Sequence, residues 1–267
     1  MTKTDVRTIK LVEMLQDQQR IDVAAASKTL GISEATVRRL FSHAEEEGKV
    51  IRVHGGVQLS PLAGHDYSYR KAASFRGRQK SLIGTAAAGL VSDNDRIFLD
   101  SGTTVLKLAE ALSMKIQTGQ LRNLVVLTNS LTYIETLASW CKVILIGGEI
   151  RVERRDVCGS IAEKSILMFH VDKAFFGADA VNVQSGFMTT DERTSRISEL
   201  LISRAECWYV LADSQKFDTH SFVTFAPVNG AHAIFTDDEL SSEQLQRYQE
   251  AGARFQIGPR PADEARE

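Results

Sequence analysis

Three short apolar stripes with helical spacing occupy the first part of the chain. They consist of Thr8, Leu11, Val12 and Leu15, then Val23, Ala26 and Leu30, then Val37, Leu40, Phe41 and Ala44. Asp22 and Ser33 are suited to cap the second and third helices, and Gly31 and Gly48 are suited to end them. Two short apolar runs then flank Gly55-Gly56, which predicts a hairpin. The order of helix, tight turn, helix and hairpin predicts a winged helix-turn-helix domain over residues 1–59.

The remainder of the chain alternates short apolar runs with helical stripes. The apolar runs are Ile97–Leu99, Leu124–Leu127, Val143–Ile146, Ala174–Phe176, Tyr209–Leu211 and Ala233–Phe235. Helical stripes lie over Ile83–Leu90, Val105–Leu112 and Ile197–Arg204. This alternation predicts an α/β domain over residues 80–257, with a parallel sheet covered by helices.

Residues 60–79 show neither helical nor strand periodicity. They include Pro61 and Gly64 and are biased towards Lys and Arg, so we predict a linker. The last ten residues, 258–267, are polar with two prolines and predict a frayed tail.

The third stripe predicts a recognition helix, because its polar residues fall on the face away from the core. Arginine binds guanine bidentately, and the N-terminal part of such a helix meets the base edges in the major groove. The candidate DNA-binding residues are Ser33, Glu34, Thr36, Arg38, Arg39 and Ser42 on the helix, with Arg52 and His54 on the wing. A protein-interaction module with a solvated arginine pair is the alternative for this domain.

Polar loops follow four of the predicted strands, where ligands bind in parallel α/β sheets. Ser, Thr and Gly residues that lead into a helix N-terminus favour an anion such as phosphate, and a lysine adds positive charge. The candidate effector-binding residues are Asp100, Ser101, Gly102, Thr103, Thr104, Thr128, Asn129, Ser130, Gly147, Gly148, Glu192, Asp213, Ser214 and Lys216. Asp100 and Glu192 are acceptors suited to sugar hydroxyls. Each loop by itself also fits ordinary helix capping.

Composition and charge limit the kinds of surface, metal site and membrane association that the chain can have. The net charge of −2 gives no overall basic footprint, so any DNA-binding surface is local. Three separated cysteines and histidines without metal-ligand spacing predict no disulfide, zinc site, metal or cofactor. No stretch approaches the ~20 apolar residues of a membrane span. We therefore expect a cytoplasmic protein that does not associate with membranes.

The motifs of both domains resemble those of DeoR-type bacterial regulators. The N-terminal likeness lies in Ile32–Arg39, Glu47-Gly48 and Arg52–Gly56, and the C-terminal likeness lies in Asp100–Thr104, Thr128–Leu131, Gly147-Gly148, Phe176–Asp179 and Asp213–Phe217. Leu40-Phe41 stands where that family usually has Asp-Leu, and Ala180 stands where many members have Gly.

The resemblance implies a sensor domain similar to the folds of ribose-phosphate isomerases and CoA transferases. It also implies a transcriptional repressor of a carbohydrate or sugar-acid catabolic operon, relieved by a phosphorylated sugar-type effector. We hypothesise that a homo-oligomer binds a repeated operator in double-stranded DNA.

Two other function classes remain for the larger domain. An aldose–ketose isomerase needs a carboxylate base, and Asp100, Glu149, Asp191 and Glu192 are available. Because an enzyme needs no DNA-reading domain, we expect a regulator without catalytic residues. A protein-binding module would show an apolar stripe unused by the core, and the sequence shows none.

Overall fold

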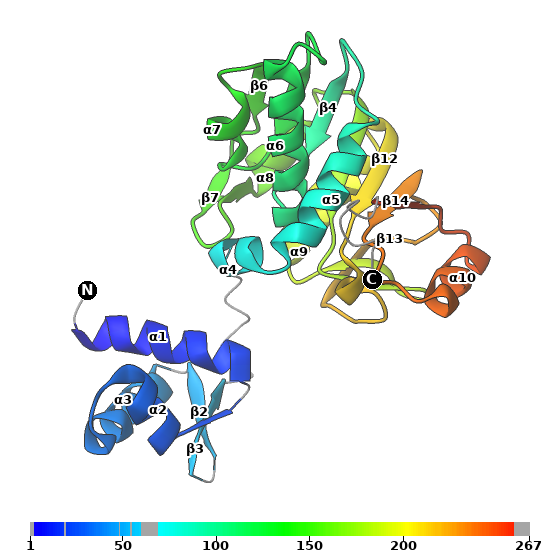
Figure 1. Ribbon diagram of the computed structural model, residues 1–267. Coiled ribbons are helices and arrows are strands. Elements are labelled where there is room, and N and C mark those ends of the chain that lie inside the picture. Colours follow the sequence, from blue (N-terminus) through cyan, green and yellow to red (C-terminus); the bar gives the residue numbers. More distant parts are fainter. Residues whose placement is uncertain (1–2, 19, 48, 54, 60–68, 259–267) are drawn as a thin grey trace. The chain divides into compact units, whose positions relative to one another are not determined.

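The computed structural model describes residues 3–18, 20–47, 49–53, 55–59 and 69–258 (Figure 1). The chain divides into two compact units, Met1–Asp66 and Tyr67–Glu267. His54 and Gly48 lie outside the described residues, as do residues 60–68 of the predicted linker and residues 259–267 of the predicted tail.

The first unit has the predicted arrangement of helices and hairpin. Its helices are α1 (Lys3–Gln18), α2 (Val23–Leu30) and α3 (Glu34–Glu46), followed by the hairpin strands β2 (Val50–Val53) and β3 (Gly56–Leu59). Strand β1 (Arg20–Asp22) pairs antiparallel with β3, giving the sheet order β1-β3-β2. We did not predict β1, because three residues are too few to show an alternating pattern.

Capping residues set both ends of α2 and the start of α3 as predicted. The Asp22 carboxylate accepts a hydrogen bond from the Ala25 amide at 2.7 Å, and Ser33 caps α3 by accepting from the Thr36 amide. Gly31 has a φ of 63°, the left-handed conformation that favours glycine. The predicted core stripe of α3, Val37, Leu40, Phe41 and Ala44, is fully buried.

The second unit is built on a parallel sheet of seven strands. In spatial order they are β15 (Phe255–Ile257), β14 (Ala233–Thr236), β12 (Ala205–Leu211), β9 (Val171–Gly177), β4 (Arg96–Leu99), β5 (Val125–Thr128) and β6 (Lys142–Leu145). All neighbouring pairs are parallel, which confirms the predicted α/β class.

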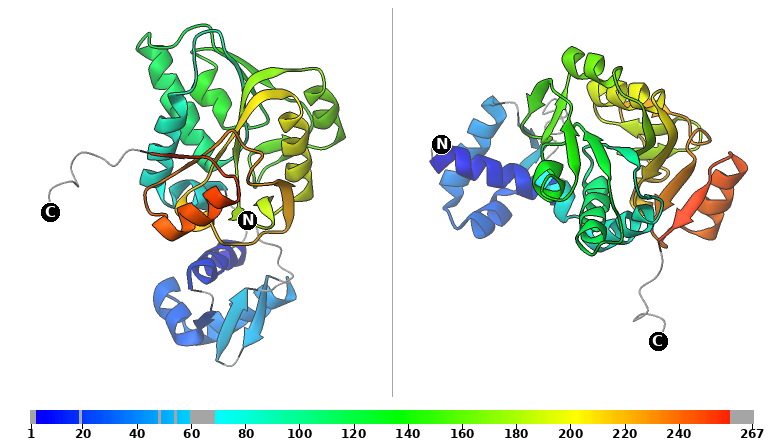
Figure 2. Two further views of the ribbon diagram at one scale, coloured as in Figure 1. Left: turned by 90° about the vertical axis from the view of Figure 1, so that its right-hand side faces the viewer. Right: turned by 90° about the horizontal axis from the view of Figure 1, so that it is seen from above.

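Both faces of this sheet are buried, because neighbouring residues of each central strand enter opposite cores. Ile97, Leu99 and Phe175 pack on one side, with α5 (Gly77–Ala88) and α6 (Thr103–Gln117). Phe98 and Phe176 pack on the other, with α8 (Ser160–Ile166) and α9 (Glu192–Ile202) (Figure 2). Two further helices, α7 (Tyr133–Leu137) and α10 (Ser242–Glu250), complete the layers.

Two small antiparallel sheets were not predicted. One pairs β7 (Glu149–Arg151) with β8 (Asp156–Cys158), and the other has the order β10 (Ala180–Asn182), β11 (Gly186–Thr189), β13 (Val223–Ala226). Their strands are three or four residues long and lie among polar residues, so they leave no clear period in the sequence.

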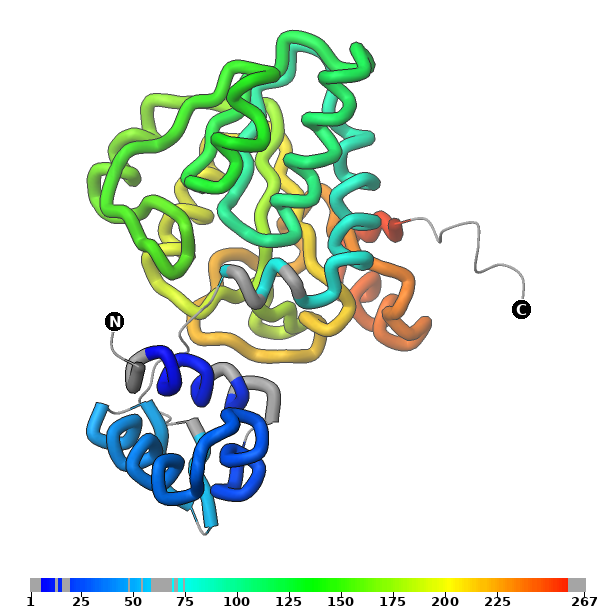
Figure 3. The backbone as a smooth tube through the Cα atoms, turned by 60° about the vertical axis from the view of Figure 1, so that its left-hand side comes forward, coloured from blue at the N-terminus to red at the C-terminus, as the bar shows by residue number. Residues whose placement is uncertain are grey.

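The structure corrects two predictions about the second unit. The predicted linker ends earlier than residue 79, because α4 (Tyr69–Ser74) and the start of α5 belong to this unit (Figure 3). The second correction concerns the apolar stripe unused by the core, of which the sequence showed none. The structure has an exposed apolar group made of Ile161 on α8 and Leu167 and Met168 after it, which are all at least half exposed. At the C-terminal boundary, Gly258 is buried and donates to the Thr236 carbonyl, so it extends the packed unit.

Candidate functional site

The outer face of α3 carries the predicted DNA-reading side chains. Ser33, Glu34, Arg38, Arg39 and Ser42 are exposed, while Thr36 is half-buried and its hydroxyl lies 2.9 Å from that of Ser33. Arg38 forms an exposed ion pair with Glu34 at 3.5 Å. Arg39 forms no hydrogen bond or ion pair with the described part of the chain. The guanidinium of Arg39 is therefore the one most available to a base edge or phosphate.

Arg52 on the wing is directed onto α3. Its guanidinium donates to the Arg38 carbonyl at 3.0 Å and to the Ser42 hydroxyl at 2.8 Å, and it lies 5.5 Å from the centre of the Phe41 ring. These contacts fix the wing against the helix. The geometry therefore supports a positioning role for Arg52. Phe41, whose ring Arg52 contacts, belongs to the Leu40-Phe41 pair at which the sequence departs from the family pattern.

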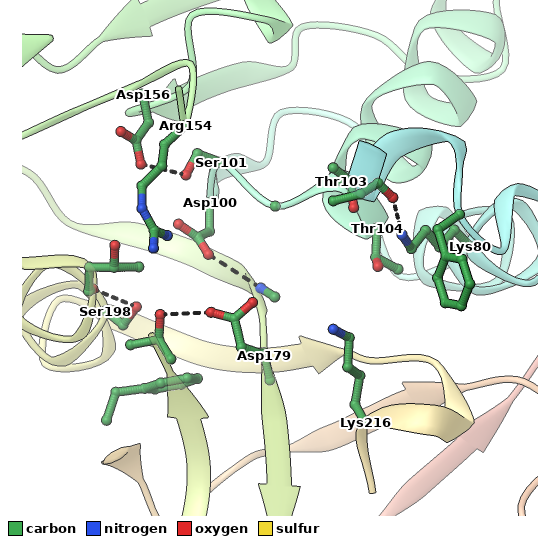
Figure 4. A pocket seen from close by; sticks show the side chains of 18 residues that line it. Lys80, Asp100, Ser101, Thr103, Thr104, Arg154, Asp156, Asp179, Ser198 and Lys216 are labelled. Atoms are coloured by element: carbon green, nitrogen blue, oxygen red, sulfur yellow. Dashed lines mark hydrogen bonds between the residues drawn. The ribbon is translucent and has the colours of Figure 1, made fainter. Parts of the chain in front are cut away.

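A cavity in the second unit lies at the carboxyl ends of β4, β9 and β12 (Figure 4). The strand order reverses between β4 and β9, because β4 leads through α6 to β5 on one side and β9 leads through α9 to β12 on the other. This is the topological switch point at which parallel sheets bind ligands. Six predicted residues line the cavity: Asp100, Ser101, Gly102, Thr103, Thr104 and Lys216.

The N-terminus of α6 is open to this cavity. Its N-cap residue, Gly102, has an extended backbone and provides no capping side chain. A Cβ on Gly102 would lie 3.5 Å from Gly177 Cα, so the first turn packs closely on the end of β9. Unsatisfied amides and the helix dipole at such a terminus favour an anion.

Two ionisable groups in the cavity have hydrogen-bonding capacity that the described residues leave unused. Asp100 is 5% exposed; its Oδ2 accepts from the Gly177 amide at 3.3 Å, and its Oδ1 is buried without a hydrogen bond. The Lys216 ammonium forms no hydrogen bond or ion pair within the described residues. A ligand with a donor for Asp100 and an anion for Lys216 would satisfy both groups.

The loop after β5 is covered by β8, whereas the loop after β6 is exposed, and neither loop lines the cavity. Thr128, Asn129 and Ser130 are buried beneath β8, which bonds to them through the Val157 amide and the Asn129 carbonyl. Gly148 packs on β8 so closely that a Cβ would lie 2.5 Å from the Cys158 carbonyl oxygen. Gly147 is also absent from the lining. The structure thus does not bring these five predicted residues to the cavity, because β8 covers the three residues after β5 and the two glycines after β6 lie at the exposed surface.

Three other predicted residues are also outside the lining. Glu192 is exposed at the start of α9. Asp213 and Ser214 are held by Arg76, with Asp213 Oδ1 at 3.3 Å from Nε and Ser214 Oγ at 3.0 Å from Nη2. They therefore position the 3₁₀ turn η1 (Ser214–Lys216) that carries Lys216.

Sequence reasoning missed several residues that line the cavity. They are Ala72, Phe75, Lys80, Arg154, Asp156, Gly177, Ala178, Asp179, Thr189, Thr194, Ser198 and Phe225. Ala72, Arg154, Asp156, Thr189 and Phe225 come from α4, the β7–β8 hairpin and the β10–β11–β13 sheet, none of which we predicted. Asp179 stood in a motif of the family resemblance, and that was the one sequence signal for it.

An ion network holds the β7–β8 hairpin beside the cavity. Arg151 donates to both carboxylate oxygens of Asp156, at 2.9 and 2.7 Å, and pairs with Asp191. The Ser101 hydroxyl donates to Asp156 at 3.1 Å. Although burial opposes it, the Thr194 amide and Arg151 keep the pKa of Asp191 below its usual value. Through its ion pair with Arg151, Asp156 therefore helps to hold the hairpin that forms part of the cavity wall.

Both units match known protein families. Residues 7–60 match the DeoR-like helix-turn-helix domain, and residues 76–238 match the DeoR C terminal sensor domain. The chain belongs to the DeoR family of transcriptional regulators. The resemblance drawn from its motifs is thereby confirmed.

Curated relatives of this DeoR-family chain match it over most of their length. It is 30% identical to the transcriptional repressor AccR of Agrobacterium fabrum, over 88% of this chain and 90% of that protein. It is also 30% identical to the lactose phosphotransferase system repressor of Lactococcus lactis subsp. lactis, over 91% and 94%. A ribose 5-phosphate isomerase from Plasmodium falciparum aligns with 52% of each chain, at 16% identity and a TM-score of 0.40.

Family membership identifies this DeoR-family protein as a DNA-binding transcriptional regulator, and the isomerase alternative is not supported. Of the four carboxylates considered for catalysis, only Asp100 lines the cavity. Glu149 pairs with Arg193 at 2.8 Å, and Asp191 caps α9. In the described ranges, no helix is long and apolar enough to cross a bilayer, no cluster of three or more metal-ligating residues occurs, and the three cysteines are free.

Asp100→Asn is expected to flatten the pH dependence of stability of this DeoR-family protein. Burial raises the pKa of Asp100 to about 6 from an ordinary value of 3.8. Because the pKa of Asp100 is higher in the folded state than in the unfolded state, the protonated Asp100 carboxyl favours folding. Its contribution to the free energy of unfolding is complete below pH 3.8 and is lost as pH rises through about 6. Thermal unfolding from about pH 4 to 8 should show a raised Tm for the variant at the upper end. The exposed Glu206→Gln is the control, and an unchanged slope for Asp100→Asn would contradict the burial argument.

Proposed function

We propose that this regulator represses a carbohydrate or sugar-acid catabolic operon and is controlled by a phosphorylated sugar-type metabolite. Operator DNA is read by α3 and the β2–β3 wing, and the effector binds at the carboxyl ends of β4, β9 and β12. The protein acts as a homo-oligomer on a repeated operator, because an α3 of one chain reads only one half-site.

The outward face of α3 supports the DNA-reading part of the proposal. Arg38 and Arg39 are adjacent and exposed near the N-terminal half of a helix whose opposite face is buried. Arg52 anchors the wing to that helix through the Arg38 carbonyl. Such an arrangement presents a rigid pair of guanidinium groups to a groove.

The observation that carries the effector proposal is the unused hydrogen-bonding capacity of two groups in one cavity. Within the described residues, Lys216 has no anionic partner and Asp100 Oδ1 has no donor. The first turn of α6 has no side-chain cap, and its residues Thr103 and Thr104 line the same cavity. A phosphate suits the ammonium and the amides, and a sugar hydroxyl suits the carboxylate. One relative is a repressor of a lactose phosphotransferase system, which supports a carbohydrate context.

Lys216→Ala should remove stabilisation of the protein by phosphorylated sugars. We expect the apparent Kd for an effective ligand to rise about tenfold to 100-fold, because a charge-assisted hydrogen bond contributes roughly 1.5–3 kcal/mol. The measurement is thermal shift against a panel of sugar phosphates and phosphorylated sugar acids.

Lys142→Ala is the matched control, since Lys142 is exposed on the edge strand β6 and is absent from the cavity lining. DNA binding without ligand should be unchanged in Lys216→Ala. A ligand that raises the Tm of wild type and of Lys216→Ala equally would reject the role of Lys216.

A further inference from the structure

Lys80 links the cavity to α4, the first element of the second unit. Lys80 lies on α5, is 4% exposed, and lines the cavity together with Thr103 and Thr104 of α6. Its ammonium donates to the Ala72 carbonyl of α4 at 2.5 Å (Figure 4). A buried cation at the proposed anion site is thus bonded to a neutral carbonyl.

The charges around Lys80 leave that cation poorly compensated. The neighbouring groups are Asp213, Lys216, Arg76 and Lys107, three of them positive. The one acid, Asp213, is paired with Arg76 at 3.3 Å. Burial lowers the pKa of Lys80 to about 8, and the positive neighbours add to this effect. An anion entering the cavity would therefore be a stronger partner for Lys80 than a peptide carbonyl is.

Helix α4 is short and has hydrogen bonds to other elements at its start and at its end. It has six residues, too few to be stable as an isolated helix, and its last carbonyls have no partner within the helix. At its start, Tyr69 is buried and its amide donates to the Glu153 carbonyl at 3.3 Å. At its end, the bond from Lys80 satisfies the Ala72 carbonyl, and Ala72 and Phe75 form part of the cavity wall.

We propose that Lys80 is a two-partner switch, which without ligand holds the end of α4 and which a bound phosphoryl group draws away to release α4. The inference rests on the proposed effector site and adds how that site is read out. Because α4 directly follows the segment that joins the two units, its release changes the part of the sensor through which the chain continues to the DNA-binding unit. The ligand favours the released state by its added contact with Lys80, which is the differential affinity that coupling requires.

The test is hydrogen exchange of the full chain with and without two probes, inorganic phosphate and glucose 6-phosphate, at constant ionic strength. With an anion bound, amides of the first turn of α6 should exchange more slowly, and amides of α4 should exchange about tenfold faster, as expected for loss of one charge-assisted bond. Lys80→Met should give fast α4 exchange without any anion, and adding one should produce no further increase.

Lys115→Met is the matched control. Lys115 makes the same kind of bond, from its ammonium to the Ala88 carbonyl at the end of α5, at 2.9 Å and away from the cavity. That variant should leave α4 exchange at the wild-type rate.

Each outcome decides the inference. If an anion slows exchange in α6 but leaves α4 unchanged or slower, the switch is wrong and the anion site stands. If neither probe changes α6 exchange, Tm or α4 exchange, the anion site and the switch fall together. If Lys80→Met does not fold, the wild-type comparison with and without anion decides the question without it.

Discussion

Replacing Arg38 and Arg39 together with alanine is expected to lower affinity for a specific operator on the order of 100-fold or more, because each arginine that reads a base contributes about 1–3 kcal/mol. Both side chains are exposed on α3, and neither is needed by the buried core on the opposite face. The helix should therefore persist in the variant, and the loss should report DNA contacts alone. The single variants should divide the effect, with the larger share at Arg39, since Arg38 must first leave its ion pair with Glu34.

The measurement is a titration at fixed salt against duplexes that wild type enriches from a random library, and against a random duplex. Loss of base reading weakens binding to the enriched duplex more than to the random one. Equal losses of affinity for both duplexes would show that the two arginines contact phosphates and do not read bases. Lys28→Ala is the charge-matched control for each single variant, because Lys28 is exposed on α2. It should weaken binding to both duplexes slightly and to the same extent.

Arg151→Ala is expected to destabilise the second unit by about 3–5 kcal/mol, the usual effect of removing one partner from a buried ion pair. The Arg151 side chain is 10% exposed, and its partner Asp156 is 1% exposed. Without the guanidinium, Asp156 retains only the Ser101 hydroxyl as a hydrogen-bond donor among the described contacts. For a unit of this size, the Tm should fall by roughly 6–20 °C.

The destabilisation in Arg151→Ala should arise because the Asp156 carboxylate stays buried without its cation. The double variant Arg151→Met with Asp156→Asn should recover much of the stability, since the buried charge is removed with its partner. Arg122→Ala is the control, because Arg122 is exposed and absent from the network. If the Tm of Arg151→Ala lies within a degree or two of the wild-type value, Arg151 does not hold the hairpin.

The sequence by itself determined the elements with strong local signals. In the first unit, the capping residues Asp22 and Ser33, the left-handed Gly31 and the buried stripe of α3 all lie within a few residues of the features they set. In the second unit, six apolar runs predicted six of the seven parallel strands, because strands buried on both faces are apolar throughout. These signals were sufficient for the fold class and for the edge of the sheet at which the cavity lies.

Tertiary structure decided which polar loops share that cavity. The loops after β4 and β12 reach it. The loop after β5 is covered by β8, and the loop after β6 is exposed outside the cavity, although all four have similar compositions. Lys80 and Asp179 were missed, because they come from different elements that only the fold brings together. Arg52 is directed onto α3 by contacts with residues ten and fourteen positions earlier. Hydrophobic periodicity and capping are local properties of a chain, whereas the partner of a charged side chain depends on long-range packing, and for that reason the sequence determined the fold class and the structure selected the site.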